Sequence, residues 1–155
     1  MKFKLLPALL VFCIGCNVSS DSAKRNYLAK GDRLYASGKY GDAVLNYKKA
    51  IRKDATFSDA YYKLGLAEIA RQSYRDAFQA FYRASELDPA NTDAKIKLAD
   101  LALSFYLSDA QHPKFLYEQF TKIARELLKK QPKSYDALRL NGELADTLGN
   151  LANRT

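Results

Sequence analysis

The chain has 155 residues, of which 48% are apolar and 27% charged, and its net charge is +8. This length and composition fit one folded domain or a short solenoid, and they argue against long structureless regions. The 25 basic residues are spread along the chain among 17 acidic ones, a pattern typical of solvated helix faces, so no nucleic-acid partner is expected.

The chain begins with the pattern of a secretion signal. Lys2 and Lys4 precede an apolar run over residues 5–14, which is about half the ~20 residues that a membrane-spanning helix needs. A short basic start followed by a short apolar core is typical of a signal peptide. The alternatives are an uncleaved anchor and an apolar tail that stays in the cytosol.

The apolar run ends in the sequence Cys-Ile-Gly-Cys at residues 13–16. It resembles the lipobox of bacterial lipoproteins, although Cys13 stands where that motif usually has Leu. The resemblance implies a signal peptide over residues 1–15, lipidation of Cys16 and a flexible tether over residues 16–23. Acyl chains hold a protein on a bilayer, so the expected location is the bacterial cell envelope. In a Gram-negative cell, the absence of Asp after the lipidated cysteine implies the outer membrane, facing the periplasm.

From residue 24 onward the periodicity is helical, because apolar residues recur at spacings of three and four. The pattern predicts helices over approximately residues 24–37, 40–53, 58–71 and 74–87. The same stretch repeats after 34 residues, which is typical of stacked helical repeats. Six residues return at this interval: Tyr27, Gly31, Tyr40, Ala43, Tyr47 and Ala50 recur as Tyr61, Gly65, Tyr74, Ala77, Phe81 and Ala84.

The second unit contains the fullest set of repeated residues, namely Tyr61, Leu64, Gly65, Ala77, Phe81, Ala84 and Pro89. This set resembles the tetratricopeptide repeat (TPR). Glu68 departs from the pattern, because its position is usually apolar, and Ile69 beside it is expected to take that place. The resemblance covers residues 24–155. It implies an all-α, TPR-type helical-hairpin solenoid with about three and a half repeats and seven helices.

The third unit breaks the period. Asp93 and Asp136 each precede an alanine and are 43 residues apart instead of 34, so nine extra residues lie between Leu107 and Leu127. A longer turn is expected before Pro113, a residue favoured at the first position of a helix. One face of that helix carries Phe115 or Leu116, Phe120, Ile123 and Leu127. The predicted repeats are residues 24–57, 58–91, 92–133 (enlarged) and 134–155 (partial or capping).

The last predicted helix runs from Ser134 to Leu148 and ends at Gly149. One interpretation is a capping helix that covers the open end of the solenoid with outward-facing polar residues. Those residues would be Asp136, Arg139, Glu143 and Asp146. The other interpretation is that this unit begins a further repeat of a longer array.

The sequence contains no recognisable catalytic constellation. His112 is the only histidine and lies beside a proline in a turn, where it is more typical of helix entry than of metal binding. The acids at helix starts are explained by capping and by the helix dipole. We therefore expect no catalytic residues, no metal, no cofactor, no small-molecule substrate and no enzymatic activity.

The TPR resemblance implies a concave groove lined by the first helix of each unit. Its predicted lining residues are Leu28, Asp32, Tyr35, Asp59, Tyr62, Leu66, Ile69, Ile96, Asp100 and Phe105. Such a groove has an apolar floor and an acidic edge, and it suits an extended or helical peptide. Alternatively, Ile69 and Phe105 belong to the core.

Some TPR domains clamp the C-terminal carboxylates of chaperones with Lys and Asn in this groove. Leu28 and Asp32 stand at those positions here, so the resemblance implies no binding of acidic C-termini. The sequence thus predicts a lipid-anchored TPR scaffold that binds a protein or peptide partner in cell-envelope assembly or export. The alternative is an N-terminal TPR module of a longer array that self-assembles without a peptide ligand.

Overall fold

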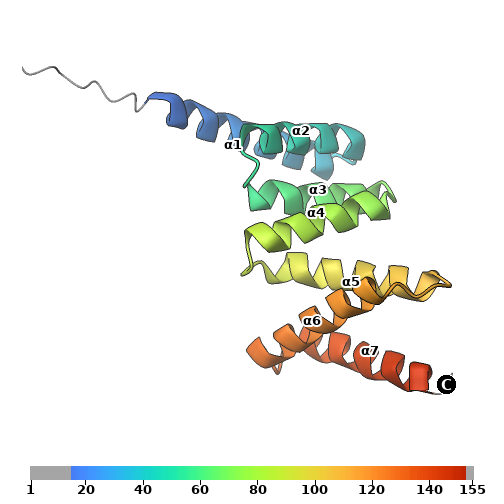
Figure 1. The fold of residues 1–155 in the computed structure, drawn as a ribbon. Helices are drawn as coiled ribbons and strands as arrows, with labels where there is room; N and C mark the ends of the chain where they lie inside the picture. Colours follow the sequence, from blue (N-terminus) through green and yellow to red (C-terminus); the bar gives the residue numbers. More distant parts are fainter. Residues whose placement is uncertain (1–14, 153–155) are drawn as a thin grey trace, which may run out of the picture.

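The computed structural model describes the backbone of residues 15–152 and the side chains of residues 21–149. Seven α-helices and no strand lie in this part of the chain, as the sequence predicts. Figure 1 shows them stacked in chain order. The helices are α1 (Gly15–Ala36), α2 (Tyr40–Lys53), α3 (Ser58–Ala70), α4 (Tyr74–Leu87), α5 (Thr92–Ser108), α6 (Lys114–Lys130) and α7 (Tyr135–Ala152).

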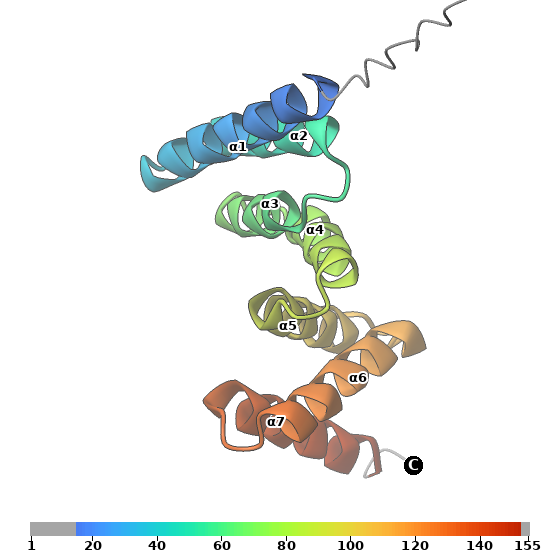
Figure 2. The ribbon, with the colours of Figure 1, turned by 90° about the vertical axis from the view of Figure 1, so that its left-hand side faces the viewer.

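The first six helices form three hairpins, and α7 is the last helix among the described residues (Figure 1). Each helix packs against the next one in the chain, and α1 also contacts α3. Figure 2 shows α3 and α5 on one side of the stack and α4 and α6 on the other. The arrangement is the helical-hairpin solenoid that the 34-residue period predicts, with a surface of odd-numbered helices and a surface of even-numbered ones.

Small residues allow the two helices of each hairpin to pack closely. A Cβ atom built on Gly31 would lie 2.5 Å from the ring of Tyr47, and one built on Gly65 would lie 2.6 Å from the ring of Phe81. Both rings are almost completely buried. The recurrence of glycine in one helix and an aromatic residue in the other is therefore a direct packing requirement.

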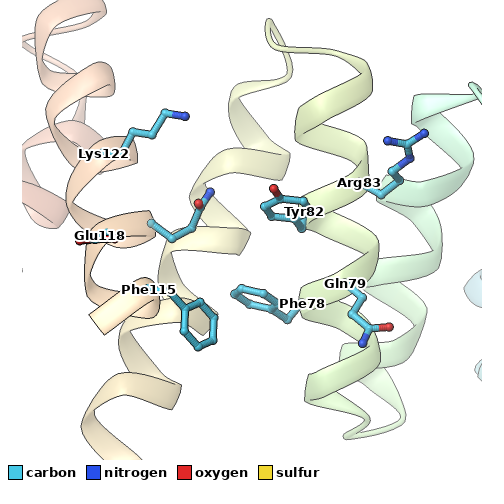
Figure 3. Close-up of a pocket in the computed structure, with 8 residues that line it drawn as sticks. Phe78, Gln79, Tyr82, Arg83, Phe115, Glu118 and Lys122 are labelled. Atoms are coloured by element: carbon cyan, nitrogen blue, oxygen red, sulfur yellow. The ribbon is translucent and has the colours of Figure 1, made fainter. Parts of the chain in front are cut away.

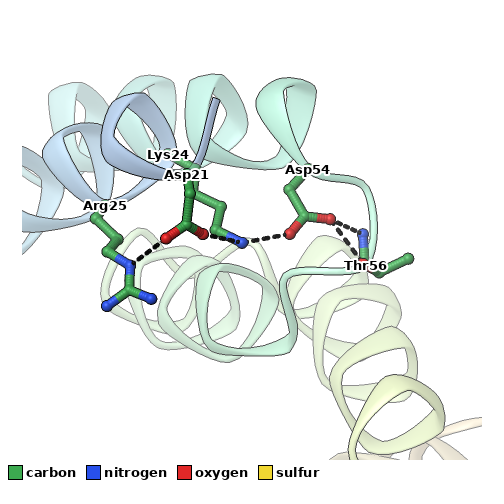
Figure 4. A network of polar contacts seen from close by, with 5 residues as sticks. All are labelled: Asp21, Lys24, Arg25, Asp54 and Thr56. Carbon is green, nitrogen blue, oxygen red and sulfur yellow. Dashed lines mark hydrogen bonds and ion pairs between the residues drawn. The ribbon is translucent and has the colours of Figure 1, made fainter. Parts of the chain in front are cut away.

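The first helix begins earlier than expected. It starts at Gly15, so residues 16–23, for which a flexible tether was predicted, are helical. Lys24 of α1 binds Asp21 at 2.8 Å and Asp54 at 2.7 Å, which ties this end of α1 to the turn after α2 (Figure 4). Hydrogen bonds from Lys24 and Thr56 lower the pKa of Asp54 to about 2.

The predicted signal peptide, residues 1–15, lies outside the described residues except for Gly15. Of Cys16, the predicted lipidation site, only the backbone is described. In the part of the chain that the structure does describe, no helix is long and apolar enough to cross a membrane.

The expectation that Ile69 replaces Glu68 at the usual apolar position of the second unit is wrong. Glu68 itself is 1% exposed, whereas Ile69 is only partly buried. The carboxylate is retained in the packed interior because Arg71 lies 2.7 Å and Lys48 of α2 lies 3.6 Å from its oxygens. A buried charge is tolerated when it is paired in this way.

His112 holds the longer turn of the third unit against the end of α5. This residue adopts a left-handed backbone conformation with a φ of 46°, and its Nδ1 lies 2.8 Å from the carbonyl oxygen of Tyr106. Its ring also packs against that of Tyr106, with 5.0 Å between centroids. In α6, Leu116 is buried and Phe115 is 62% exposed, which decides between the two candidates for the inner face.

The last helix runs to Ala152, past Gly149, where the sequence predicted its end. Three of its polar residues predicted to face outward are joined by ion pairs, because Arg139 binds Asp136 and Glu143 and also Asp100 of α5. They therefore lie toward α5, and the residues left uncovered on α7 are mostly apolar.

Candidate peptide-binding groove

The ten predicted groove residues all lie on the odd-numbered helices α1, α3 and α5. Asp59 is exposed, Ile96 is a member of the buried core, and the other eight are partly buried. Partial burial is the condition expected of residues that pack on the core below them and contact a ligand above them.

A small pocket of about 170 Å³ lies between α1 and α3, lined by Asp32, Tyr35, Tyr47, Lys63 and Leu66. The Tyr47 hydroxyl donates a hydrogen bond to Asp32 at 2.8 Å, and the Lys63 ammonium lies 3.5 Å from the same oxygen. Burial, together with the hydrogen bond to Asp32, raises the pKa of Tyr47. The hydroxyl therefore stays neutral and holds the carboxylate in place.

The floor of the groove continues along α3. The ring of Tyr62 packs on Phe81 with 5.9 Å between centroids, and Leu66 and Ile69 rest on the same core cluster. The pKa of Tyr62 is raised by burial, with the charge of Asp93 and the proximity of Tyr35 adding to the effect. A rigid base supports each of these side chains, so they form a preorganised apolar surface.

The acidic edge that the sequence predicts is largely neutralised by neighbouring cations. Asp32 is held by Lys63, and Asp100 is held by Arg139 at 2.9 Å. In both cases the cation comes from the first helix of a later unit, so these ion pairs join neighbouring units along the groove. Of the predicted acids, only Asp59 is exposed.

Phe105 is placed apart from the other predicted groove residues. Its ring packs on Phe78 of α4, with 5.8 Å between centroids, and it lines a cleft between α4 and α6 together with Phe78 and Phe115. The reason is its position near the C-terminal end of α5, beside the enlarged turn.

The cleft between α4 and α6, on the opposite surface from the groove, is a feature that sequence reasoning missed. Figure 3 shows Phe78 and Phe115 facing each other across it. One pocket there has a volume of about 690 Å³, and a second of about 640 Å³ shares these two phenylalanines. The nine extra residues of the third unit were the feature of the sequence from which this cleft could have been predicted. The lining of the larger pocket is Phe78, Gln79, Tyr82, Arg83, Phe115, Glu118, Gln119 and Lys122.

The arrangement offers packing surfaces and ion pairs. Among the described residues, no group of three or more His, Cys, Asp or Glu side chains could hold a metal ion. The surface formed by the odd-numbered helices can bury apolar side chains of a ligand, with polar groups at its margin.

Comparison with known proteins identifies the fold. Residues 31–68 match the family model described as TPR repeat. Serine/threonine-protein phosphatase T of Aspergillus oryzae (strain ATCC 42149 / RIB 40) is 39% identical over 61 residues, which cover 39% of this chain. The matched part spans only 13% of the length of the phosphatase and falls in its TPR region.

Two solved structures show the same architecture. The first TPR of Spaghetti (RPAP3) bound to HSP90 peptide SRMEEVD has a TM-score of 0.65 at 18% identity, with 84% of this chain and 94% of that chain covered. YrrB, described as a TPR protein with an unusual peptide-binding site, has a TM-score of 0.66 at 17% identity, with 82% of this chain and 61% of that chain covered. The class that the fold and these matches define is a TPR-type helical-hairpin solenoid.

Proposed function

We propose that this protein is a lipid-anchored TPR scaffold that binds a protein or peptide partner in the groove of its odd-numbered helices. The observation that carries the proposal is the row of partly buried Tyr35, Tyr62, Leu66 and Ile69 along α1 and α3. Apolar side chains that rest on a rigid core bind a ligand without a large ordering cost. The peptide-binding descriptions of the Spaghetti domain and of YrrB support a groove that binds peptides.

The partner that fits this groove is a segment with apolar anchors. Because Asp32 and Asp100 are already paired with cations, the groove presents little free charge along its floor. Leu28 stands where carboxylate-clamping TPR domains carry Lys. The groove therefore suits apolar or aromatic side chains of an extended or helical segment better than a terminal carboxylate.

The proposed site of action is the cell envelope, with the protein held on a membrane by acylated Cys16. The lipobox-like residues 13–16 support this part of the proposal. The expected location is the outer membrane facing the periplasm in a Gram-negative cell, within an assembly or export system. Because α1 begins beside the cysteine, the anchor would keep the groove close to the bilayer surface.

Metabolic labelling with palmitate tests the anchor. Wild type is expected in the membrane fraction and labelled, and Cys16→Ser is expected to be unlabelled and soluble. Cys13→Ser is the matched control and is expected to retain the label, since only the last residue of the motif is acylated. Unlabelled wild type in the soluble fraction would refute the lipoprotein assignment.

A cross-linking pull-down tests the groove. Tyr62→Ala and Leu66→Ala are expected to lower recovery of the partner, and Tyr82→Ala in the cleft between α4 and α6 is the matched control. Equal recovery with all three variants would move the binding site off the groove. Concentration-dependent self-association of wild type with no captured partner would favour the alternative, a self-assembling module of a longer array.

A further inference from the structure

The nine extra residues of the third unit lengthen both helices of its hairpin. The helix α5 has 17 residues against 13 in α3, and by the 34-residue period the four added residues are 105–108. The turn after α5 spans residues 109–113, two more than the turn at residues 71–73. The helix α6 has 17 residues against 14 in α4, and it ends at residue 130, which is 43 after the end of α4 at residue 87, so its three added residues are 114–116. These four, two and three residues account for all nine.

The added turns carry two aromatic residues that form part of the cleft between α4 and α6. Phe105 lies on the added turn of α5, and its ring packs on Phe78 of α4. Phe115 lies on the added turn of α6, is 62% exposed and faces Phe78 across the cleft (Figure 3). The insertion therefore places aromatic surface beside α4 and leaves part of it open to solvent, which is typical of an interaction site.

The cleft runs along α4 and α6 as a row of three adjoining pockets. The pocket beside the enlarged turn has a volume of about 640 Å³, the middle one about 690 Å³, and the one toward the C-terminal ends of both helices about 300 Å³. The first two pockets share Phe78 and Phe115, and the last two share Tyr82, Gln119 and Lys122. The three pockets therefore form one elongated cleft.

The spacing of the lining residues suits a helical ligand. Phe78 and Tyr82 are four residues apart on α4, and Phe115, Gln119 and Lys122 follow at spacings of four and three on α6. Side chains at these spacings form a ridge along one face of a helix. Both helices run in the same direction, so two ridges flank the cleft (Figure 1). An amphipathic helix can place its apolar stripe between them and leave its polar face in water.

Three of the four acidic side chains that line the cleft are already paired with cations. Glu118 lies 3.2 Å from Lys114, and Glu86 lies 3.1 Å from Arg83. Glu126 is held by two lysines, one on α5 and one on α6. These acids therefore give the cleft little free negative charge.

Two cations of the cleft, by contrast, have no acid within ion-pair distance among the described residues. They are Arg75, beside the enlarged turn, and Lys122, which lines both the middle pocket and the smallest one. The fourth acid, Asp109, lies at the same end as Arg75 and accepts a hydrogen bond from the backbone N–H of Gln111. The free charge around Lys122 is thus positive, and an acidic side chain of a ligand is favoured there.

This requirement excludes the part of the chain that precedes α1. Residues 1–14 are mostly apolar, but their only charged side chains are Lys2 and Lys4, which would meet the like charge of Lys122. The cleft also lies in the middle of the stack, and the neighbouring helices α3, α5 and α7 leave it open. Because each helix packs against the next one in the chain, a unit that followed α7 would stack at that end of the solenoid and not in this cleft (Figure 1).

We propose that the cleft between α4 and α6 binds an acidic amphipathic helix of a protein partner. One large apolar side chain of this helix inserts between Phe78 and Phe115, and an apolar residue one turn further contacts Tyr82. A carboxylate beside the apolar stripe faces Lys122. The cleft lies on the opposite surface from the groove of the proposed function, so a scaffold of this shape can hold two partners at once.

Fluorescence anisotropy with the full chain tests the cleft. The probe is a fluorescein-labelled model helix about 18 residues long, with Leu and Phe along one stripe at spacings of three and four and Glu at the flanking positions. A second peptide has the same stripe with Lys in place of each Glu. The acidic peptide is expected to bind saturably and at least about tenfold more tightly than the basic one.

Variants of the chain assign this binding to the cleft. Phe115→Ala removes an exposed ring, so it is expected to weaken binding of the acidic peptide by about tenfold or more with little change in melting temperature. Leu45→Ala, at an exposed apolar residue of α2, is the matched control and is expected to leave binding unchanged. Lys122→Glu is expected to weaken binding by about tenfold. Lys129→Glu changes the net charge equally on the same helix outside the cleft, and it is expected to have little effect.

Four results would overturn the proposal. The first is an acidic peptide that does not bind or that binds Phe115→Ala as well as wild type. The second is an equal effect of Lys122→Glu and Lys129→Glu, which would mean that only the net charge attracts the peptide. The third is binding of sodium dodecanoate that depends on Phe115 without binding of the peptide, which would make an anionic amphiphile the occupant. The fourth is a dimer of wild type that Phe115→Ala converts to monomer in sedimentation experiments, which would make a second copy the occupant. None of these results bears on the groove, which is tested separately by Tyr62→Ala and Leu66→Ala.

Discussion

Gly65 lies so close to the ring of Phe81 that a Cβ atom at its position would be 2.6 Å from the nearest ring carbon. Phe81 is completely buried between the helices of the second hairpin and cannot move aside without disturbing the core. This relationship explains why a glycine stands inside a helix, where it is otherwise unfavourable.

Gly65→Ala is therefore expected to destabilise the protein, although alanine is the better helix former. Overpacking of a core contact costs about 1–3 kcal/mol. Gly142→Ala is the matched control, because it has open space around it, and it is expected to stabilise by up to about 1 kcal/mol. Chemical denaturation of both variants measures the difference. A gain of stability in Gly65→Ala would show that the two helices are not closely packed there.

Gln72 occupies the turn position that Gly38 occupies in the first unit, and both have a left-handed backbone, with φ values of 61° and 72°. This conformation costs a residue with a Cβ about 1–2 kcal/mol, whereas glycine adopts it freely. Gln72→Gly is expected to raise the free energy of unfolding by about 1 kcal/mol, and Gly38→Gln to lower it by a similar amount. Equal stability of Gln72→Gly and wild type in urea denaturation would contradict this account.

The buried carboxylate of Glu68 is retained at a cost in desolvation. Its Oε1 accepts no hydrogen bond, and its ion-pair partners Arg71 and Lys48 are themselves substantially exposed. Glu68→Leu is expected to be neutral or to stabilise by about 1 kcal/mol, because burial of an ion pair often costs more than it returns. Arg71→Leu is expected to destabilise, since it removes the nearer of the two cations. Thermal melts of both variants test this, and strong destabilisation by Glu68→Leu would count against it.

Glu126 makes the stability of the third hairpin depend on acid. Hydrogen bonds from Lys130 and from Lys95 of α5 lower the pKa of Glu126 to about 2. Ionised Glu126 makes its full contribution to the stability of the fold at a pH above the ordinary pKa range of a carboxyl group. That contribution is lost as the pH falls toward about 2. Because Lys130 is exposed, this contribution to the free energy of unfolding is about 1 kcal/mol.

Glu126→Gln is thus expected to lower stability near neutral pH and to lose this deficit as the pH falls. Glu118→Gln removes the exposed pair with Lys114 and serves as the control, with little change at any pH. Urea titrations of the variants across this pH range measure the effect. A deficit of Glu126→Gln that stays constant with pH would mean that its carboxylate is not specially stabilised in the folded state.

The groove is expected not to bind acidic C-terminal peptides. Asp32 lies where clamp-type TPR domains use Asn, and it is fixed by Tyr47 and Lys63. A terminal carboxylate placed there would meet a like charge and an apolar Leu28. Isothermal titration calorimetry with the peptide SRMEEVD, which the Spaghetti domain binds, checks this. Micromolar binding would show that the groove recognises carboxylates by other residues.

The sequence predicted the elements and their period, because helix formation and hairpin packing depend on local spacing. Gly31 and Gly65, with Tyr47 and Phe81 in the facing helices, could be recognised from their 34-residue interval. The sequence could not decide whether Phe115 or Leu116 is the buried residue, and it could not predict the burial of Glu68. Each depends on which neighbouring helix lies opposite.

The sequence by itself determined an all-α stack of helical hairpins, its seven helices and the residues on its odd-numbered surface. Only the tertiary structure decided which of these residues are free to contact a partner. Asp32 and Asp100 are occupied by cations from the neighbouring units that follow them, Phe105 turns to the cleft between α4 and α6, and the face of α7 around Gly142 is uncovered. The physical reason is that periodicity fixes the direction of a side chain on its own helix, whereas its partner is set by how helices far apart in the sequence pack.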